Sequence, residues 1–587
     1  MRRRLIPLLL AAFVLFSLGL LISAQGPEDS KFQKSLDAYL DAYWKFYPTS
    51  GTLAGYNKYN DRLEDLNPNA VEKRNNELDI FNQELVTKIN KANLSPENQA
   101  DLEILVDALD LELFRHESLV PWEYNPLFYN EILANCVQGL LGKNTAPLEA
   151  RVKSATERLK QISGFLKQAK ENLKTPAQIY TETAIAQFPG ILNFYKNDMA
   201  ALAAGASAEA KNKLMAEAAK AVTALEDFKN FLRNELLARS TGNFRLGQQA
   251  HLRLMRLTGQ GSIVPEDLVA RANADFNNIR REMFLVCIPF FKIMYPSIDL
   301  DRMTRPKDEV WAIAIKGVFD KIKTEHLSRD EFVSGARSTA ATLKAFIEAH
   351  NLTALPEGMP AIEVMPVEKR GLAFTHLQGP GPYESSGPYT LYISPIPDDW
   401  PPEAVNSFLE EYHNYIFPFA VAKRVYPGPY VPLVMTRQNP SLVRKLYPNL
   451  PLLRGWPAYM EETLVTAGYG NYDLRLRLSQ LEMQLKAAMD YLLELNIHQG
   501  SMTDEQAINY MTRSGFQSEA EAKRKWKQII LNPGEAAYTY IGYQEILDIE
   551  KDYKKAKGDS FKQSEFLQKL LSYGAIPLRQ LKTRIMQ

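Results

Sequence analysis

Cysteine is almost absent from this sequence. Only Cys136 and Cys287 occur among 587 residues, so at most one disulfide can form and a disulfide framework is excluded. Two alternatives stay open for this pair, one bridge or two buried free thiols. Because no Cys-x-x-Cys spacing occurs, metal and redox sites built on that motif are excluded as well.

An excess of one charge is also lacking. The chain carries 69 basic and 69 acidic residues, which gives a formal net charge of zero. A domain that binds nucleic acid usually has a basic surplus, so we predict no nucleic-acid partner. The 45% apolar and 24% charged residues are ordinary for a folded protein with a sizeable core.

Long apolar runs are missing except at the N-terminus. There, three arginines precede the apolar run from Leu5 to Ile22, and the small residues Ser23 and Ala24 follow. This layout predicts a signal peptide over residues 1–24 and export to the periplasm or the cell exterior. The alternative is an uncleaved N-terminal anchor, and we predict no other membrane contact. Because no cysteine lies near the junction, a lipid anchor on an N-terminal cysteine is not expected.

Self-contained catalytic motifs are missing too. The sequence has no phosphate-binding loop, no dinucleotide glycine fingerprint, no Gly-x-Ser-x-Gly and no His-Glu-x-x-His. Its seven histidines are scattered, and no two stand at the spacing of metal ligands on one helix turn. These motifs therefore assign no enzyme class.

Helical patterns, in contrast, are abundant. Apolar residues recur at steps of three and four over residues 148–173 and 214–232, which predicts two long amphipathic helices that pack as neighbours. Three pairs with capping-box spacing predict further helix starts: Ser328 with Glu331, Thr503 with Gln506, and Ser518 with Glu521.

One region breaks the helical pattern. Prolines and glycines crowd between Leu355 and Pro402, and the aromatic and β-branched run from Tyr389 to Ser394 predicts a short strand. We therefore predict a mainly α fold with a small β-sheet near residues 370–400. Residues 25–587 are expected to form one large helical body, with a helical bundle over 25–350 and any chemistry over 351–587.

The C-terminal half contains short motifs in a specific order. They are Trp400-Pro401-Pro402, Val425-Tyr426-Pro427-Gly428, Gly455-Trp456, Tyr459-Met460-Glu461-Glu462 and Gly574-Ala575-Ile576-Pro577-Leu578. With Tyr47-Pro48 near the N-terminus, this series resembles the bacterial "domain of unknown function 885" family over nearly the whole mature chain. The resemblance implies a helical, zincin-like zinc peptidase of the thimet-oligopeptidase-like kind, which hydrolyses peptides.

The catalytic pattern that the resemblance implies is His-Glu-x-x-Pro-Gly-His followed by Gly-Trp-x-x-Tyr-x-Glu. In register with Pro427-Gly428, the two histidine positions hold Lys423 and Pro429, and the base position holds Arg424. An ammonium cannot donate to Zn²⁺ at neutral pH, a guanidinium stays protonated, and proline has no ligand atom. We therefore predict no metal and no cofactor, although zinc is expected for the family.

Some residues of the implied pattern remain in place or are shifted. Two arginine positions fall on Ala487 and Asp490, a later one on Glu550, and a tyrosine position on Thr539. The relics of the site are Glu461, Glu494, His498, and Tyr538 or Tyr540. A buried Glu461 needs a cationic partner, so we predict a Lys423–Glu461 pair. The alternative is that Lys423 and Arg424 point to solvent.

A cleft can persist after catalysis is lost. If Tyr389 to Ser394 is an edge strand, an extended peptide can pair with it, and aromatic side chains would line the cleft: Tyr389, Tyr392, Tyr426, Trp456 and Tyr459. We favour an exported, non-catalytic relative of a zinc peptidase that binds a peptide or protein. The alternatives are a divergent hydrolase that uses the relic residues without the usual zinc site, and a structural envelope protein.

Overall fold

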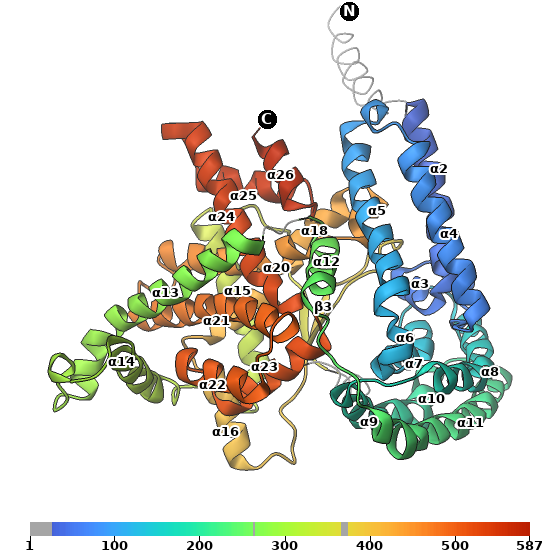
Figure 1. Ribbon diagram of the computed structural model, residues 1–587, viewed down its shortest axis with the longest axis horizontal. Helices are drawn as coiled ribbons and strands as arrows, with labels where there is room; N and C mark the ends of the chain where they lie inside the picture. Colours follow the sequence, from blue (N-terminus) through green and yellow to red (C-terminus); the bar gives the residue numbers. More distant parts are fainter. Residues whose placement is uncertain (1–25, 262–264, 366–373, 587) are drawn as a thin grey trace, which may run out of the picture.

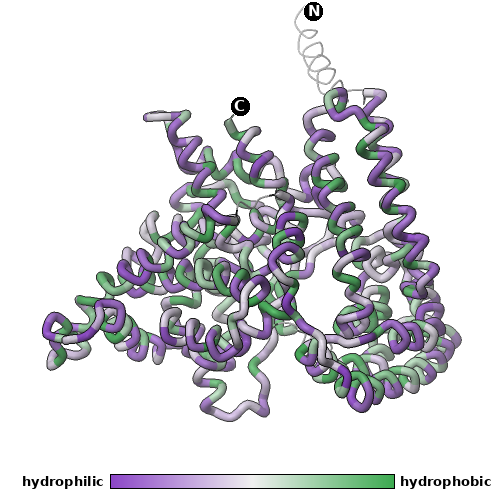
Figure 2. The backbone as a smooth tube through the Cα atoms, viewed as in Figure 1, coloured by the Kyte–Doolittle hydropathy of each residue, from purple (hydrophilic) through white to green (hydrophobic). Residues whose placement is uncertain are grey.

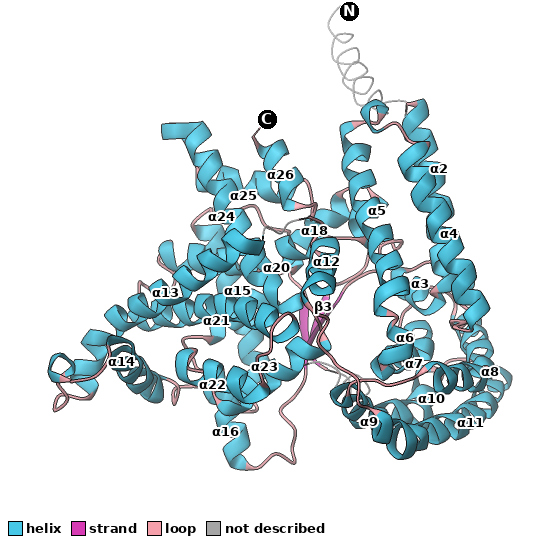
Figure 3. Cartoon of the chain, viewed as in Figure 1, coloured by secondary structure: helices cyan, strands magenta, loops and turns pink. Residues whose placement is uncertain are grey.

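The computed structural model describes residues 26–261, 265–365 and 374–586. The predicted signal peptide lies outside these residues. The described chain is mainly helical and has one small three-stranded sheet, which confirms the predicted fold class at that level (Figures 1 and 3). None of its described helices is both long and apolar enough to cross a membrane.

The N-terminal part consists of helices alone. They are α2 (Pro27–Phe46), α3 (Pro48–Ala54), α4 (Pro68–Thr87), α5 (Pro96–Phe114), α6 (Pro121–Tyr124), α7 (Pro126–Leu141), α8 (Leu148–Asn172), α9 (Gln178–Asn193), α10 (Met199–Leu202) and α11 (Ala208–Phe231). Proline occupies the first turn of α2 to α7, where its missing N–H costs no helical hydrogen bond.

The two predicted amphipathic helices are α8 and α11, and they pack as neighbours. Leu159 of α8 and Leu225 of α11 lie in one buried core, and Lys170 pairs with Asp227 across the two helices. The three-and-four spacing of apolar residues therefore predicted both helices and their shared interface. Figure 2 shows the same alternation of hydrophobic and hydrophilic residues along many other helices.

The middle of the chain leads into the sheet. Its helices are α12 (Gln248–Thr258), α13 (Pro265–Met294), α14 (Lys307–Ile322) and α15 (Phe332–Ala349). The strands are β1 (Ala361–Val364), β2 (Thr375–Gln378) and β3 (Thr390–Ile393), in the order β1-β3-β2. Strand β3 is parallel to β1 and antiparallel to β2.

The predicted strand is present but is not an edge strand. β3 pairs on both sides, so its backbone groups are used within the sheet and cannot receive a peptide. The expectation that Tyr389 to Ser394 forms the pairing edge is therefore wrong. Sequence pattern shows that a strand forms, whereas its place in the sheet depends on partners distant in the chain.

Helices dominate again after the sheet. They are α16 (Pro402–Glu411), α17 (Phe417–Arg424), α18 (Tyr430–Gln438), α19 (Leu442–Leu446), α20 (Leu450–Thr466), α21 (Leu474–His498), α22 (Asp504–Ser514), α23 (Glu519–Leu531), α24 (Tyr538–Lys557), α25 (Gln563–Ser572) and α26 (Leu578–Ile585). Figure 3 shows the labelled ones to the left of the sheet or above it.

Capping residues begin two of the three predicted helices. Thr503 and Gln506 form a complete capping box at α22, and the Ser518 side chain accepts from the Glu521 N–H at α23. Ser328 differs, because it bonds to the Glu331 side chain while α15 begins only at Phe332. Its spacing therefore marks a turn before the helix and not the helix start.

One buried core joins both ends of the chain. Phe32 and Leu105 from the N-terminal helices share it with Trp456 and Leu581 from the C-terminal part. A division near residue 350 is therefore not a boundary between separate cores. Cys136 and Cys287 are both buried and free, so no disulfide contributes to this packing.

Candidate functional site

The turn between α17 and α18 carries the motif that the sequence predicts to be altered. Lys423 and Arg424 are the last residues of α17, and Pro429 immediately precedes α18. The Trp456 indole N–H donates to the Pro427 carbonyl at 3.1 Å, which attaches this turn to α20. Because α20 also carries Glu461, this contact holds the turn near that buried carboxylate.

Glu461 and Lys423 influence each other's pKa. Glu461 is 2% exposed; its burial raises the pKa, and the charges of Lys423 and Arg424 oppose that rise. Burial lowers the pKa of Lys423, Lys525 lowers it further, and Glu461 and Asp490 oppose this effect. Lys423 therefore lies within electrostatic range of Glu461 and does not simply project into solvent.

The two groups are not in direct contact. No Lys423–Glu461 ion pair within 4.0 Å occurs among the described residues, and Oε1 of Glu461 is buried without a hydrogen-bond partner there. Next to them, the ammonium of Lys525 binds Asp490 at 2.7 Å. The cluster thus contains three cations and two carboxylates: Lys423, Arg424, Lys525, Glu461 and Asp490.

Two more of the predicted relic residues, Glu494 and His498, lie in a second buried cluster. Glu494 and His498 are one turn apart on α21, and Oε1 of Glu494 lies 3.6 Å from Nε2 of His498. The same oxygen accepts the Gly534 N–H at 2.7 Å and lies 2.8 Å from Nε2 of His251, on α12. The two imidazoles stack with centroids 4.9 Å apart. No sequence pattern distinguishes His251 from the other histidines.

Burial controls protonation in this second cluster. It raises the pKa of Glu494 to about 7, which His498 and two backbone N–H groups only partly offset. It lowers the pKa of His251 to about 4 and also lowers that of His498. Both imidazoles are therefore neutral at pH 7, and Glu494 is the group that titrates near that pH.

The hydroxyls of Tyr538 and Tyr540 have different hydrogen-bond partners. The Tyr538 hydroxyl donates to the Met255 carbonyl at 3.2 Å, and the Tyr540 hydroxyl donates to Asp275 at 2.7 Å. The structure therefore brings Glu494 and His498 together, while Glu461 lies within electrostatic range of Lys423 without an ion pair between them.

The aromatic residues predicted for a cleft have different surroundings. Tyr426 and Trp456 are completely buried, and Tyr459 is buried with its hydroxyl donating to Glu550 at 2.8 Å. Tyr389 is only partly buried, and its ring contacts Tyr430, which the sequence did not single out, at 5.3 Å. Tyr392 is a residue of β3.

The residues present do not suit a zinc ion. In the described part of the chain, no group of three or more His, Cys, Asp or Glu side chains is arranged to hold a metal. At the two histidine positions of the implied family pattern, an ammonium and a proline ring stand instead of zinc donors, and a guanidinium occupies the position of the base. No catalytic step is therefore derived through a metal.

The helical architecture, the small mixed sheet and the two buried charged clusters together define a large, mainly α-helical protein. The chain belongs to the family described as "Bacterial protein of unknown function (DUF885)", which matches residues 48–585. This confirms the family that the sequence motifs resemble.

Two solved structures have the same architecture. A candidate lipoprotein of unknown function from Shewanella oneidensis is 26% identical, with a TM-score of 0.80 over 95% of this chain and 100% of that one. A candidate lipoprotein from Colwellia psychrerythraea is 15% identical, with a TM-score of 0.73 over 94% of this chain and 98% of that one. No curated protein matches this chain.

Proposed function

We propose that this protein is an exported, non-catalytic member of its family that descends from a zinc peptidase and binds an extended peptide or protein segment. The observation that carries the proposal is the charge arrangement at the altered motif. Lys423 and Arg424 act electrostatically on the buried Glu461. A cation can stabilise this carboxylate in place of a dication, but it cannot activate water as zinc does.

Export is part of the proposal. The arrangement of the first residues is that of a signal peptide, and the two similar structures are described as candidate lipoproteins.

The outer edge of β2 is the place that we propose for peptide pairing. Ser394 N–H donates to the Phe374 carbonyl, so Thr375 and Leu377 direct their backbone groups away from β3. Among the described residues these outward groups have no partner, and a strand edge of this kind can receive an extended chain. Tyr389, which immediately precedes β3, would contribute an aromatic surface.

Metal analysis tests the catalytic half of the proposal. Protein purified without chelators is expected to hold substoichiometric zinc and to leave a peptide library uncleaved. The variant K423H/R424E/P429H rebuilds the family pattern and is expected to gain zinc that a chelator removes. Stoichiometric zinc in the wild type, with peptidase activity that a chelator abolishes, would overturn the proposal; failure of the rebuilt site to bind zinc would contradict the zinc-peptidase ancestry.

Backbone-methylated peptides test the binding half. Octapeptides selected by fluorescence anisotropy are N-methylated on either alternating set of amides, because only one set can face the edge of β2. One methylated set is expected to lose binding and the other to retain it. Equal binding by both sets would exclude strand pairing.

A second candidate function is an acid–base hydrolase without metal. The pKa of Glu494, about 7, favours it, because a general acid or base is most effective near the operating pH. Against it, Glu494, His251 and His498 are all completely buried. Peptide-library cleavage that Glu494→Gln abolishes in a folded protein would establish this candidate and exclude the first.

A further inference from the structure

A groove between α12, α13, α21 and α22 lies apart from the altered motif. It has a volume of about 660 Å³ and is lined by carboxamide, aliphatic and aromatic side chains and one glycine. The polar side chains are Gln248, Asn273, Asn496 and Gln499, and the others are Val269, Leu492, Leu495, Met502 and Tyr510. We call it the amide groove. Figure 1 shows α13 lying beside α21, the two long helices that form its walls.

The two asparagines present acceptor oxygens to the groove. The amide nitrogen of Asn273 donates to the Val269 carbonyl at 2.9 Å, and that of Asn496 donates to the Leu492 carbonyl at 2.8 Å. A backbone carbonyl can only accept, so these bonds fix which end of each amide is nitrogen. Each Oδ1 then faces away from its own helix and has no donor among the described residues.

The buried cluster of Glu494 and His251 orients the Gln499 amide as well, so that its carbonyl oxygen is the end left for the groove. When Glu494 is ionised its Oε1 can only accept, so it receives both the Gly534 N–H and the Nε2–H of His251. Nδ1 of His251 is then an acceptor, and it receives the amide nitrogen of Gln499 at 2.9 Å. The carbonyl oxygen of Gln499 is left as a third acceptor.

The walls of the amide groove are held in place from outside. Arg245 donates to the Met502 carbonyl at 2.7 Å and to the Ile497 carbonyl, and the Gly247 N–H donates to the His498 carbonyl at 3.0 Å. The start of α12 and the end of α21 are therefore tied together. A preformed site of this kind loses little conformational freedom when a ligand binds.

The lining selects for the chemistry of the ligand. Several acceptors with no charged side chain among them require a ligand rich in hydrogen-bond donors. An ammonium or guanidinium would lose its hydration without gaining a carboxylate, whereas hydroxyl groups lose much less. The aliphatic side chains and the Tyr510 ring suit a ligand that also has C–H faces.

We propose that the amide groove is a binding site for a neutral saccharide. Its hydroxyl groups donate to the oxygens of Asn273, Asn496 and Gln499, and its C–H face packs on Tyr510 and Met502. This proposal does not depend on the peptide-binding proposal, because none of these residues belongs to β2 or to the altered motif.

Calorimetric titration of the mature full-length chain tests this site. The probes are hexamers of β-1,4-linked glucose, α-1,4-linked glucose and β-1,4-linked N-acetylglucosamine, with spermidine as the cationic comparison. At least one hexamer is expected to bind with a Kd below about 1 mM. Asn273→Leu and Asn496→Leu are each expected to weaken that binding by about fivefold or more, because each removes one acceptor.

Asn277→Leu is the matched control. Asn277 lies one turn beyond Asn273 on α13 and makes the same bond to its own helix, to the Asn273 carbonyl at 3.0 Å, but it does not line the groove. Its Kd is expected to stay within about twofold of the wild-type value. Failure of all three hexamers to bind, binding of spermidine alone, or equal affinities in all three variants would each overturn the proposal.

Discussion

At the residue scale, neighbouring cations decide how a buried carboxylate titrates. Glu482 lies 3.0 Å from Lys486 and 3.6 Å from Lys323, and although burial raises its pKa, these two charges bring it well below the ordinary value. Glu494 has two neutral imidazoles as neighbours instead, so its pKa rises. The two carboxylates are thus equally buried, but their pKa values shift in opposite directions because their neighbours differ in charge.

Glu494→Gln is expected to change the pH dependence of stability. The pKa of Glu494 rises from 4.5 to about 7 on folding. The stabilisation of the folded protein by protonated Glu494 is therefore fully present below pH 4.5 and is lost as pH rises through 7. Glutamine does not titrate. The difference in free energy of unfolding, variant minus wild type, should therefore increase by about 3 kcal/mol from pH 4.5 to pH 8.

Urea unfolding of both proteins across this pH range measures the difference. Burial lowers the pKa of both His251 and His498, so neither imidazole accounts for a change in stability near pH 7. A difference that stays constant from pH 4.5 to pH 8 would contradict the raised pKa.

At the element scale, local sequence signals begin helices that tertiary contacts then position. The capping box at Thr503 begins α22, and that helix places Tyr510 in the amide groove. Sequence alone identified this helix start correctly because cap and helix are neighbours in the chain. It was wrong at Ser328, where the same spacing forms a turn and α15 begins at Phe332.

Thr503→Ala is expected to lower the free energy of unfolding by about 1 kcal/mol, because the N–H of Gln506 loses its acceptor. Urea unfolding measures this loss. Thr342→Ala is the matched control, since Thr342 is exposed inside α15 and bonds only to its own helix at Ser338. A loss of stability as large in the control would show that the cap contributes nothing.

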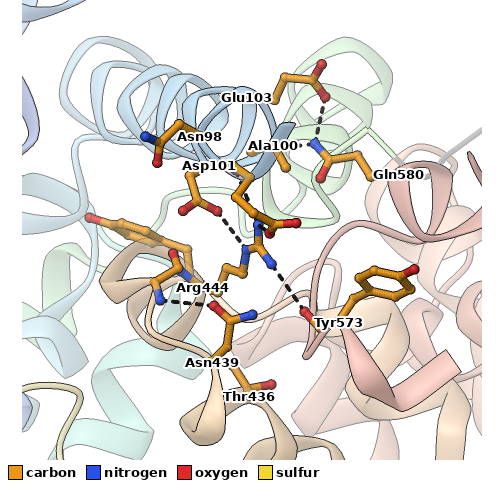
Figure 4. Close-up of polar contacts among 12 residues, drawn as sticks. Asn98, Ala100, Asp101, Glu103, Thr436, Asn439, Arg444, Tyr573 and Gln580 are labelled. Atoms are coloured by element: carbon orange, nitrogen blue, oxygen red, sulfur yellow. Dashed lines mark hydrogen bonds and ion pairs between the residues drawn. The ribbon is translucent and has the colours of Figure 1, made fainter. Parts of the chain in front are cut away.

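At the scale of the whole molecule, one buried arginine joins distant parts of the chain. Arg444 is completely buried, and its Nε donates to Asp101 of α5 at 2.7 Å, across 343 positions of sequence. It also pairs with Glu97 and donates to the Tyr573 carbonyl at 3.5 Å (Figure 4). This contact connects the N-terminal helices to the C-terminal part.

Arg444→Met is expected to lower the free energy of unfolding by about 3–5 kcal/mol, because it leaves Asp101 buried without its cation. Urea unfolding and limited proteolysis of the N-terminal helices measure the effect. The double variant R444M/D101L is expected to recover part of the loss, since no charge is then left unpaired.

Arg513→Met, at an exposed position on α22, is the control and should be nearly neutral. If Arg444→Met proves equally neutral, the proposed connection between the two parts of the chain would be wrong.

The sequence by itself determined the mainly helical fold, the helices at 148–173 and 214–232, a strand at 389–394 and the family. Each of these depends on neighbours in the chain or on short motifs, which can be identified without coordinates. It also predicted that Lys423 and Glu461 belong to one site.

Only the tertiary structure decided which of these residues meet. It placed β3 between two other strands, brought His251 from α12 to Glu494 on α21, and oriented the amides of the groove between α13 and α21. The physical reason is that burial, pKa and hydrogen-bond orientation depend on surfaces contributed by segments hundreds of residues apart, and no local pattern encodes those partners.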